Sequence, residues 1–153
     1  MSHRDVRSVV RIFNYYVEHS FAAYPESPVA EEPFQELRKA AHLALVAKHA
    51  GDVVGFAIMR PFHHASTFQR TAEVSYFIDP EHTGQHLGSI FLEKLIENAR
   101  TLHIDWLLAS VSSRNEGSLA FHRKHGFEEC GHFRDIGRKN GQDFGIVWFQ
   151  KRI

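Results

Sequence analysis

A strand, helix, strand pattern in the middle of the chain limits its possible folds more than any other feature. Residues 71–78 form an apolar run that ends at Asp79-Pro80, residues 87–102 repeat apolar side chains at helical spacing, and residues 104–111 form another short apolar run. When a helix connects two neighbouring strands of one sheet, the strands lie parallel. The sheet of this protein must therefore contain a parallel pair.

Hairpins on either side of this unit add antiparallel pairs. Apolar runs at 43–47 and 53–59 are separated by Ala50-Gly51-Asp52, and the two last strands flank Asn140-Gly141, a dipeptide typical of tight hairpin turns. The sheet is therefore expected to be mixed and mostly antiparallel.

Helices account for the remaining periodic segments. Ser2 and Asp5 form a capping-box pattern before apolar residues that recur at helical spacing as far as Val17. Shorter helices are predicted at 34–41 and at 115–125, the second ending at Gly126. Together with the strands, this order predicts a single α/β domain over residues 1–153, with helices flanking one layer of sheet.

Composition and charge restrict the partners. The chain has 43% hydrophobic and 24% charged residues, which is typical of a folded globular domain, and its 18 basic residues equal its 18 acidic residues. Because no net positive field attracts phosphate backbones, we expect a small-molecule partner and no nucleic acid. The single cysteine, Cys130, and the absence of an apolar signal or membrane segment predict a cytoplasmic protein that does not bind membranes.

Twelve histidines raise the question of a metal site. His122 and His125 are three residues apart on a predicted helix, and His82 and His86 are four apart in a loop. Neither pair is accompanied by the cysteines or carboxylates of a typical metal site, so we expect surface or packing histidines and no metal.

The stretch from Ser75 to Ser89 predicts a phosphate-binding turn. A strand runs into a loop that contains Gly84 and Gly88, and the long central helix follows. Helix N-termini leave backbone N–H groups unpaired and carry partial positive charge, so a pyrophosphate is a natural ligand there, and glycine lets it approach closely. Taken alone, this pattern is also common in turns that only connect elements.

A second stretch makes the interpretation specific. Asn115, Ser118, Phe121, His122 and Gly126-Phe127 lie on the next helix and its exit. Together the two stretches resemble the cofactor-binding motifs of the GNAT acetyltransferase superfamily. Further matches resemble its phosphinothricin N-acetyltransferase group: Ile12-Phe13-Asn14-Tyr15-Tyr16-Val17, Val54-Gly55-Phe56-Ala57, Ala72-Glu73-Val74-Ser75 and Val147-Trp148-Phe149-Gln150.

The resemblance implies the GNAT fold, acetyl-coenzyme A as co-substrate, and a set of cofactor-binding residues. It places Tyr76, Phe77 and Ile78 along the pantetheine arm and thioester, through backbone hydrogen bonds. It assigns Asn115 to the pantetheine or the attacking amine, adds Ser118 on the same helix, and lets Lys124 reach a phosphate of the nucleotide. The residues expected around the pyrophosphate are Gly84, Gln85, His86, Leu87, Gly88 and Ser89.

The same resemblance implies catalytic roles for Glu73 and His122. A protonated amine cannot attack a thioester, so a base must remove its proton, and Glu73 matches the acidic residue that the group uses. His122 stands where other members have a tyrosine that protonates the departing thiolate, and imidazole titrates in a useful range. From the residues alone, Glu73 can instead be a solvated strand residue and His122 a surface histidine of the helix.

The acceptor is expected to be the primary amine of a small amino-acid-like molecule such as phosphinothricin or methionine sulfoximine. Phe21, Tyr24 and Phe68, together with Glu73, are the residues expected to line its pocket. One alternative is a protein N-terminal or lysine acetyltransferase, which needs an open channel for a peptide. Members of the group commonly form homodimers, so the resemblance also implies a homodimer.

Two departures from the motif leave a further alternative, a non-catalytic acyl-coenzyme A binding module. Thr83 replaces the usual arginine or glutamine, and His86 replaces a usual glycine. We expect backbone strain at His86 unless its φ is negative.

Overall fold

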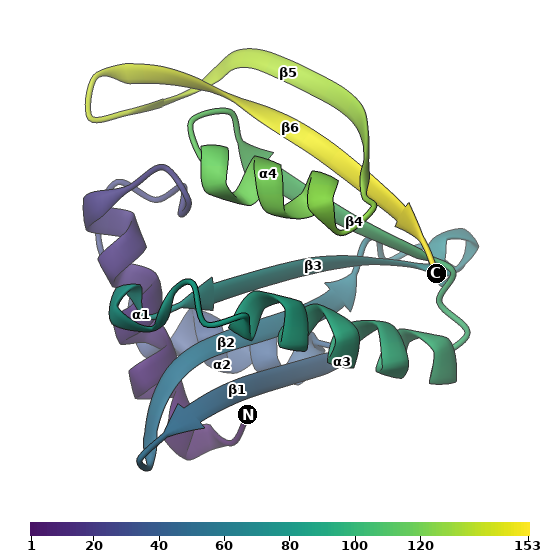
Figure 1. Ribbon diagram of the computed structural model, residues 1–153, viewed down its shortest axis with the longest axis horizontal. Coiled ribbons are helices and arrows are strands. Elements are labelled where there is room, and N and C mark those ends of the chain that lie inside the picture. The colour runs from purple at the N-terminus through teal and green to yellow at the C-terminus, as the bar shows by residue number, and fades with distance from the viewer.

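The computed structural model describes residues 1–153 and contains one six-stranded sheet in the order β1-β2-β3-β4-β6-β5 (Figure 1). The strands are β1 (Leu43–His49), β2 (Asp52–Pro61), β3 (Thr71–Ile78), β4 (Trp106–Ser112), β5 (Glu128–Lys139) and β6 (Gln142–Arg152). All neighbouring strands are antiparallel except β3 and β4, which are parallel. The expected mixed, mostly antiparallel sheet is therefore confirmed.

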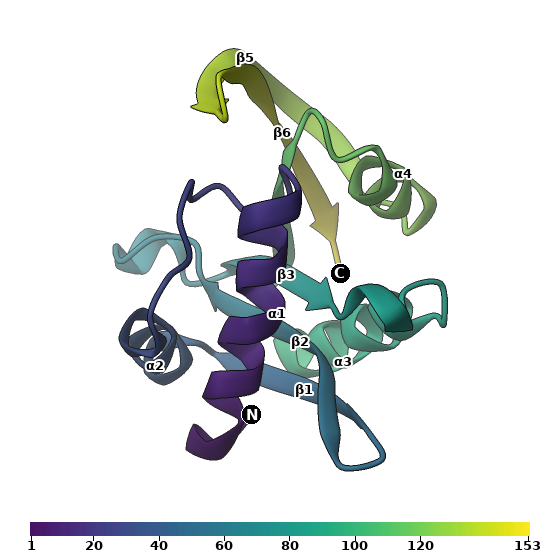
Figure 2. The same ribbon diagram turned by 90° about the vertical axis from the view of Figure 1, so that its left-hand side faces the viewer.

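Helices cover both faces of the sheet. The helix α1 (Val6–His19) and the shorter α2 (Glu31–Ala40) lie on one face, and α3 (Leu87–Thr101) and α4 (Glu116–Lys124) lie on the other (Figure 2). Short 3-10 helices precede α1 (His3–Asp5), follow β2 (Ser66–Phe68) and precede α3 (Pro80–His82). The second helix begins at Glu31, earlier than residue 34 where it was predicted, because Pro33 is tolerated within a first helical turn.

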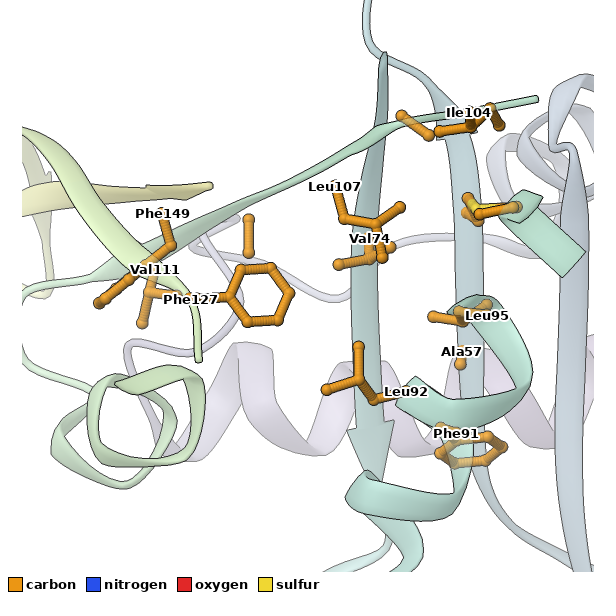
Figure 3. Packing of buried hydrophobic residues seen from close by; sticks show 14 of the residues in the cluster. Ala57, Val74, Phe91, Leu92, Leu95, Ile104, Leu107, Val111, Phe127 and Phe149 are labelled. Atoms are coloured by element: carbon orange, nitrogen blue, oxygen red, sulfur yellow. The ribbon is translucent and has the colours of Figure 1, made fainter. Parts of the chain in front are cut away.

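The buried core is divided by the sheet. On one face, Leu92 and Leu95 of α3 point toward the sheet, where Ala57, Val74 and Leu107 lie (Figure 3). On the opposite face a smaller cluster joins α1 and α2 to alternate residues of β2, including Phe56 and Ile58. Because neighbouring side chains of a strand point to opposite faces, β2 and β3 contribute to both clusters.

The pairing between β3 and β4 is short, and this shapes the molecule. It contains the pairs Thr71 with Trp106, Ala72 with Leu107 and Glu73 with Leu108, and goes no further. Beyond Glu73 the two strands diverge, which is visible as the widening between them in Figure 1. The sheet is thus split from one end, and the residues from Val74 to Ile78 have no strand partner on the side that faces β4.

The two predicted hairpin turns are both present. Ala50 and Gly51 have φ of 49° and 95°, and Asn140 and Gly141 have φ of 51° and 72°. Two successive positive φ angles are characteristic of the type I′ turn, which matches the twist of the strands it joins. The turn at Asn140-Gly141 places β5 beside β6 at one edge of the sheet.

Candidate active site

A cavity of about 440 Å³ occupies the space between the diverging strands. It is lined by residues of β3 and β4, by the turn before α3, by α4 and by the region of α1 and its exit. These residues are Tyr16, Ala22, Val74, Ser75, Tyr76, Phe77, Ile78, Thr83, Gly84, Gly88, Ala109, Ser110, Val111, Ser112, Asn115, Gly117, Ser118, Phe121 and His122.

The structure brings many of the expected cofactor-binding residues to this one cavity. Tyr76, Phe77, Ile78, Gly84, Gly88, Asn115 and Ser118 all line it. Gln85, His86, Leu87, Ser89 and Lys124 lie in the same turn and helices but do not line it, and Lys124 is exposed to solvent. The N-terminus of α3, with its unpaired backbone N–H groups, adjoins the cavity at Gly84 and Gly88.

The two glycines of the turn serve different purposes. Gly84 has φ of 75° and open space around it, so its backbone conformation is what favours glycine there. At Gly88 a Cβ atom would lie 3.1 Å from Cε2 of Phe121, so the missing side chain allows α3 and α4 to pack closely. Backbone conformation at Gly84 and helix packing at Gly88 therefore each favour glycine.

His86 adopts a left-handed backbone conformation, which is strained for a residue other than glycine. It is the residue that precedes α3, and its φ of 62° lies in the left-handed region. Such a conformation costs a residue other than glycine about 1 kcal/mol. The expectation of strain at this substituted position therefore holds.

Three side-chain hydrogen bonds stabilise the helices around the cavity. His125 Nδ1 lies 2.8 Å from the carbonyl oxygen of Phe121 and therefore donates to it, which leaves Nε2 to accept from the Ser89 hydroxyl at 2.9 Å. This contact joins the end of α4 to the first turn of α3. Asn115 caps α4, since its Oδ1 accepts from the backbone N–H of Ser118 at 3.2 Å.

Tyr76 and His122 form a hydrogen-bonded pair at the wall of the cavity. The Tyr76 hydroxyl lies 2.6 Å from His122 Nε2, and His122 Nδ1 lies 2.7 Å from the carbonyl oxygen of Ser118. Because a carbonyl oxygen can only accept, Nδ1 carries the proton and Nε2 accepts from Tyr76. The pattern of the sequence did not assign a role to the Tyr76 side chain, although Val74 and Tyr76 necessarily share a face of β3.

Burial keeps this pair in its neutral form. His122 is 2% exposed, and burial lowers its pKa, partly opposed by the hydrogen bond to Ser118. Burial also raises the pKa of Tyr76 well above its usual range. The proton between the two side chains therefore belongs to the Tyr76 hydroxyl. His122, which accepts this hydrogen bond, fixes the orientation of that hydroxyl.

Glu73 lies where β3 and β4 separate. It belongs to the last pair of the parallel ladder, it is buried, and its side chain is on the face of the sheet that carries α1 and α2. Arg60 Nη2 lies 2.7 Å from Glu73 Oε2, and the Ser110 hydroxyl donates to Oε1 at 3.1 Å. Glu73 itself does not line the cavity, but the carboxylate is held by Ser110, which does.

Sequence patterns had not indicated Arg60 and Ser110 as members of the site. Arg60 lies directly opposite Glu73 in the antiparallel pairing of β2 with β3, so the hairpin register would have identified it. Ser110 depends on the register between β3 and β4, which are separated by a helix, and no local signal gives that register.

The expected acceptor residues are distributed over two places. Phe21 and Tyr24 pack on Phe144, with ring centroids 5.6 Å and 5.8 Å away, and Ala22 between them lines the cavity. Burial raises the pKa of Tyr24, the Glu73 carboxylate raises it further, and Ser110 lowers it. Phe68 instead lines a separate cavity with His63, and the structure does not bring it to the central one.

A smaller apolar cavity of about 240 Å³ adjoins the site on the face of α1 and α2. Phe13, Phe34, Leu37 and Phe56 are among its lining residues, together with Ser75 and Phe77, which also line the central cavity. A molecule whose reacting group lies near Glu73 would thus have apolar surface close by.

No group of three or more His, Cys, Asp or Glu side chains is arranged to hold a metal ion. None of the helices combines the length and the apolar character that crossing a membrane requires.

A comparison with known families identifies the architecture. The model of the acetyltransferase (GNAT) family matches residues 9–127, which include both cofactor motifs and Glu73. The chain belongs to the GNAT acetyltransferase family. Membership of this family makes the protein an acyltransferase, as the sequence predicted. Its cavity lies where β3 and β4 separate.

Individual relatives are similar over nearly the whole GNAT chain. An L-methionine sulfoximine/L-methionine sulfone acetyltransferase of Pseudomonas paraeruginosa is 29% identical over 97% of this chain and 90% of its own length. The crystal structure of a phosphinothricin acetyltransferase from Sinorhizobium meliloti in complex with acetyl-coenzyme A has a TM-score of 0.92 and 25% identity, covering 100% of this chain and 85% of that one.

A third relative has a different name. The crystal structure of ribosomal-protein-alanine N-acetyltransferase from Brucella melitensis has a TM-score of 0.91 and 32% identity, and the match covers 100% of this chain and 97% of that one. The fold is therefore shared by proteins whose names specify both small-molecule and protein acceptors.

Proposed function

We propose that residues 1–153 act as a single transferase domain that moves the acetyl group of acetyl-coenzyme A to the primary amine of a small, amino-acid-like acceptor. The observation that carries this proposal is the position of the Glu73 carboxylate, at the point where β3 and β4 separate and beside the cavity between them. This arrangement would place the thioester between the two strands and the Glu73 carboxylate, as the base, at the end of the split where the strands meet.

The proposed chemistry uses the chain's own groups in a fixed order. Glu73, directly or through a water, takes a proton from the ammonium group of the acceptor, and the free amine then attacks the thioester carbon. Backbone N–H groups of β3 near Phe77, left without a strand partner, are available to stabilise the oxyanion. When the C–S bond breaks, the nitrogen gives up its second proton and the departing thiolate of coenzyme A takes up one, so the products are an amide and a free thiol.

The proposed cofactor site combines the turn before α3 with β3 and α4. Gly84 and Gly88 adjoin the N-terminus of α3, where a pyrophosphate would receive backbone hydrogen bonds. Tyr76, Phe77, Ile78, Asn115 and Ser118 line the space in which the pantetheine arm would lie. The neighbour from Sinorhizobium meliloti supports acetyl-coenzyme A as the co-substrate.

The acceptor class rests on relatives and on the local chemistry. The printed names of relatives include acetyltransferases for L-methionine sulfoximine and phosphinothricin. Arg60 provides a cation beside the base, half exposed and able to attract an acidic group of the acceptor. The neighbouring apolar cavity gives room for the aliphatic part of such a molecule.

The test is a thiol-release assay on a panel of amino acids and their analogues. We expect free thiol only with acetyl-coenzyme A and a suitable amine, and a loss of at least about 100-fold in kcat for Glu73→Gln, in keeping with removal of a general base. Glu81→Gln, at an exposed position outside the site, is the matched control. No release across the panel, or full activity of Glu73→Gln, would contradict the proposal.

A protein acceptor remains the second candidate, because the relative from Brucella melitensis is named for ribosomal protein alanine. Peptides with N-terminal alanine belong in the same assay. Faster acetylation of these peptides than of any free amino acid would select this function. Calorimetric binding of acetyl-coenzyme A without turnover on either panel would instead indicate a non-catalytic acyl-coenzyme A binding module.

We further propose that the protein is a cytoplasmic homodimer without nucleic-acid or membrane partners. The equal numbers of acidic and basic residues support the absence of a nucleic-acid partner. The free edge of β5, which pairs only with β6, carries the exposed Phe133 and Ile136 and supports contact with a second copy.

A further inference from the structure

Lys139, at the end of β5, is a lysine buried inside the protein. Only 1% of it is exposed, and its ammonium group lies 2.8 Å from the carbonyl oxygens of both Ser20 and Ala23. These carbonyls are more than one hundred residues away in the sequence, in the loop that leaves α1. The proposed reaction does not use this charge, so it needs another explanation.

The ammonium group satisfies backbone acceptors that the loop cannot satisfy itself. Ser20 is the residue at the C-terminal cap of α1, where helix carbonyls lack partners within the helix. Burial lowers the pKa of Lys139, and the nearby Glu26 opposes this, which reflects the cost of enclosing a cation. An apolar side chain of similar length would fill the space but would leave both carbonyls without a donor.

The loop held by Lys139 carries the acceptor half of the site. Ala22 lines the central cavity together with Ser110, whose hydroxyl donates to Glu73. Phe21 and Tyr24 rest on Phe144, which belongs to the same hairpin as Lys139.

The hairpin itself is closely fitted beneath these rings. The Phe144 ring lies over Gly137, where an added Cβ atom would approach within 2.5 Å. At the far end of the loop, the backbone N–H of Asn140 donates to Glu26 at 3.2 Å. The turn of the hairpin therefore holds the loop at several points. Among these contacts, the ammonium group of Lys139 is the only charged group that binds the backbone of the loop.

We propose that Lys139 is a positioning residue for the amine acceptor: by binding the carbonyls of Ser20 and Ala23 it holds the loop that places Ala22 at the central cavity and Tyr24 against Phe144. The expected effect of Lys139 on acceptor binding rests on the proposed function. The contact between the lysine and the loop does not depend on which amine is used. Cofactor binding, which involves the turn before α3, is not expected to depend on Lys139.

The test compares Lys139→Met with the wild type in two measurements. Steady-state kinetics should show an acceptor KM raised at least about tenfold and a KM for acetyl-coenzyme A within about twofold of the wild-type value. Hydrogen exchange should show faster exchange of the amides of residues 20–24, with the amides of β4 unchanged. Lys39→Met, at an exposed lysine paired with Glu36, is the matched control.

Lys139→Arg keeps the charge and the donors, and should restore both slow exchange and the acceptor KM more fully than Lys139→Met. If Lys139→Met does not fold, Lys139→Gln, which keeps amide donors, should show the same selective changes. Unchanged loop exchange together with an unchanged acceptor KM would overturn the proposal. Equal increases in both KM values would also overturn it, since they indicate a general loss of structure.

The two proposals can fail separately. If the wild-type protein acetylates no amine or peptide, the proposed function fails, and the exchange experiment still decides whether Lys139 holds the loop. If the wild type is active and loop exchange is the same in Lys139→Met, the role of Lys139 fails alone.

Discussion

At the scale of single residues, the site depends on side chains whose protonation is fixed by their surroundings. His122 is enclosed between Tyr76 and the Ser118 carbonyl, and one ring nitrogen donates while the other accepts. A second proton on this ring would face the Tyr76 hydroxyl hydrogen and would be buried without a compensating charge. The Tyr76 and His122 pair is therefore stable as a neutral unit.

This burial predicts a pH dependence of stability. The pKa of His122 is lowered in the folded protein and returns to about 6.5 on unfolding, so the unfolded chain binds the proton more readily. The stabilising effect is complete above about pH 6.5 and is lost as the pH falls toward the lowered folded value. Urea unfolding between pH 7.5 and pH 5.5 should show a smaller decrease in the free energy of unfolding for His122→Gln than for the wild type.

The chain contains other histidines, so a matched variant is needed. His103→Asn replaces an exposed histidine and should keep the pH dependence of the wild type. The same slope in His122→Gln and the wild type would contradict the assignment of a neutral, buried imidazole.

At the scale of elements, the start of α3 carries a conformational cost. His86 is held in the left-handed region beside a turn that is proposed to bind a pyrophosphate. Glycine adopts this φ without steric strain, although it loses more entropy on folding.

We therefore predict that His86→Gly raises the free energy of unfolding by about 0.5 to 1 kcal/mol, measured by urea unfolding. His103→Gly, at another residue with positive φ, 56°, near the end of α3, should give a similar gain. Calorimetric titration should show a change in affinity for acetyl-coenzyme A only for His86→Gly, since His103 is far along the helix from the turn. Destabilisation by His86→Gly would show that the imidazole makes contacts that outweigh the strain.

Local patterns were sufficient to predict most elements, because each has its own periodicity or turn. The central helix, both hairpins and the parallel pair follow from apolar spacing and from residues such as Asn140-Gly141. The position of Phe68 was not predictable, since it depends on how the loop after β2 folds onto its neighbours. The contact of Lys139 with Ser20 was equally inaccessible, because nothing local relates a hairpin to a loop so far away in the chain.

At the scale of the whole molecule, the split sheet separates two tasks. The α3 and α4 side contributes the turn and helix that are proposed to bind the cofactor, and the α1 and α2 side contributes Glu73, Arg60 and the apolar cavity. The two sides meet where β3 and β4 diverge. A reaction between two substrates is thereby possible without either substrate crossing the core.

The edge of the sheet bears on how whole molecules associate. Strand β5 pairs only with β6, and Phe133 and Ile136 are 55% and 60% exposed on it. An open strand edge with exposed apolar side chains favours pairing with a second chain, and two copies meeting through the same surface form a closed dimer. We predict that the wild type sediments at about twice its monomer mass of 17.6 kDa at micromolar concentration. Phe133→Ser combined with Ile136→Ser should shift it toward the monomer.

The control for this prediction is Ile90→Ser combined with Leu102→Ser, which removes comparably exposed apolar side chains from the region of α3. This variant should remain dimeric, because α3 lies on a face of the sheet and not at the β5 edge. A wild-type protein that sediments as a monomer throughout the micromolar range would contradict the dimer. A double serine variant on β5 that remains dimeric would place the interface elsewhere.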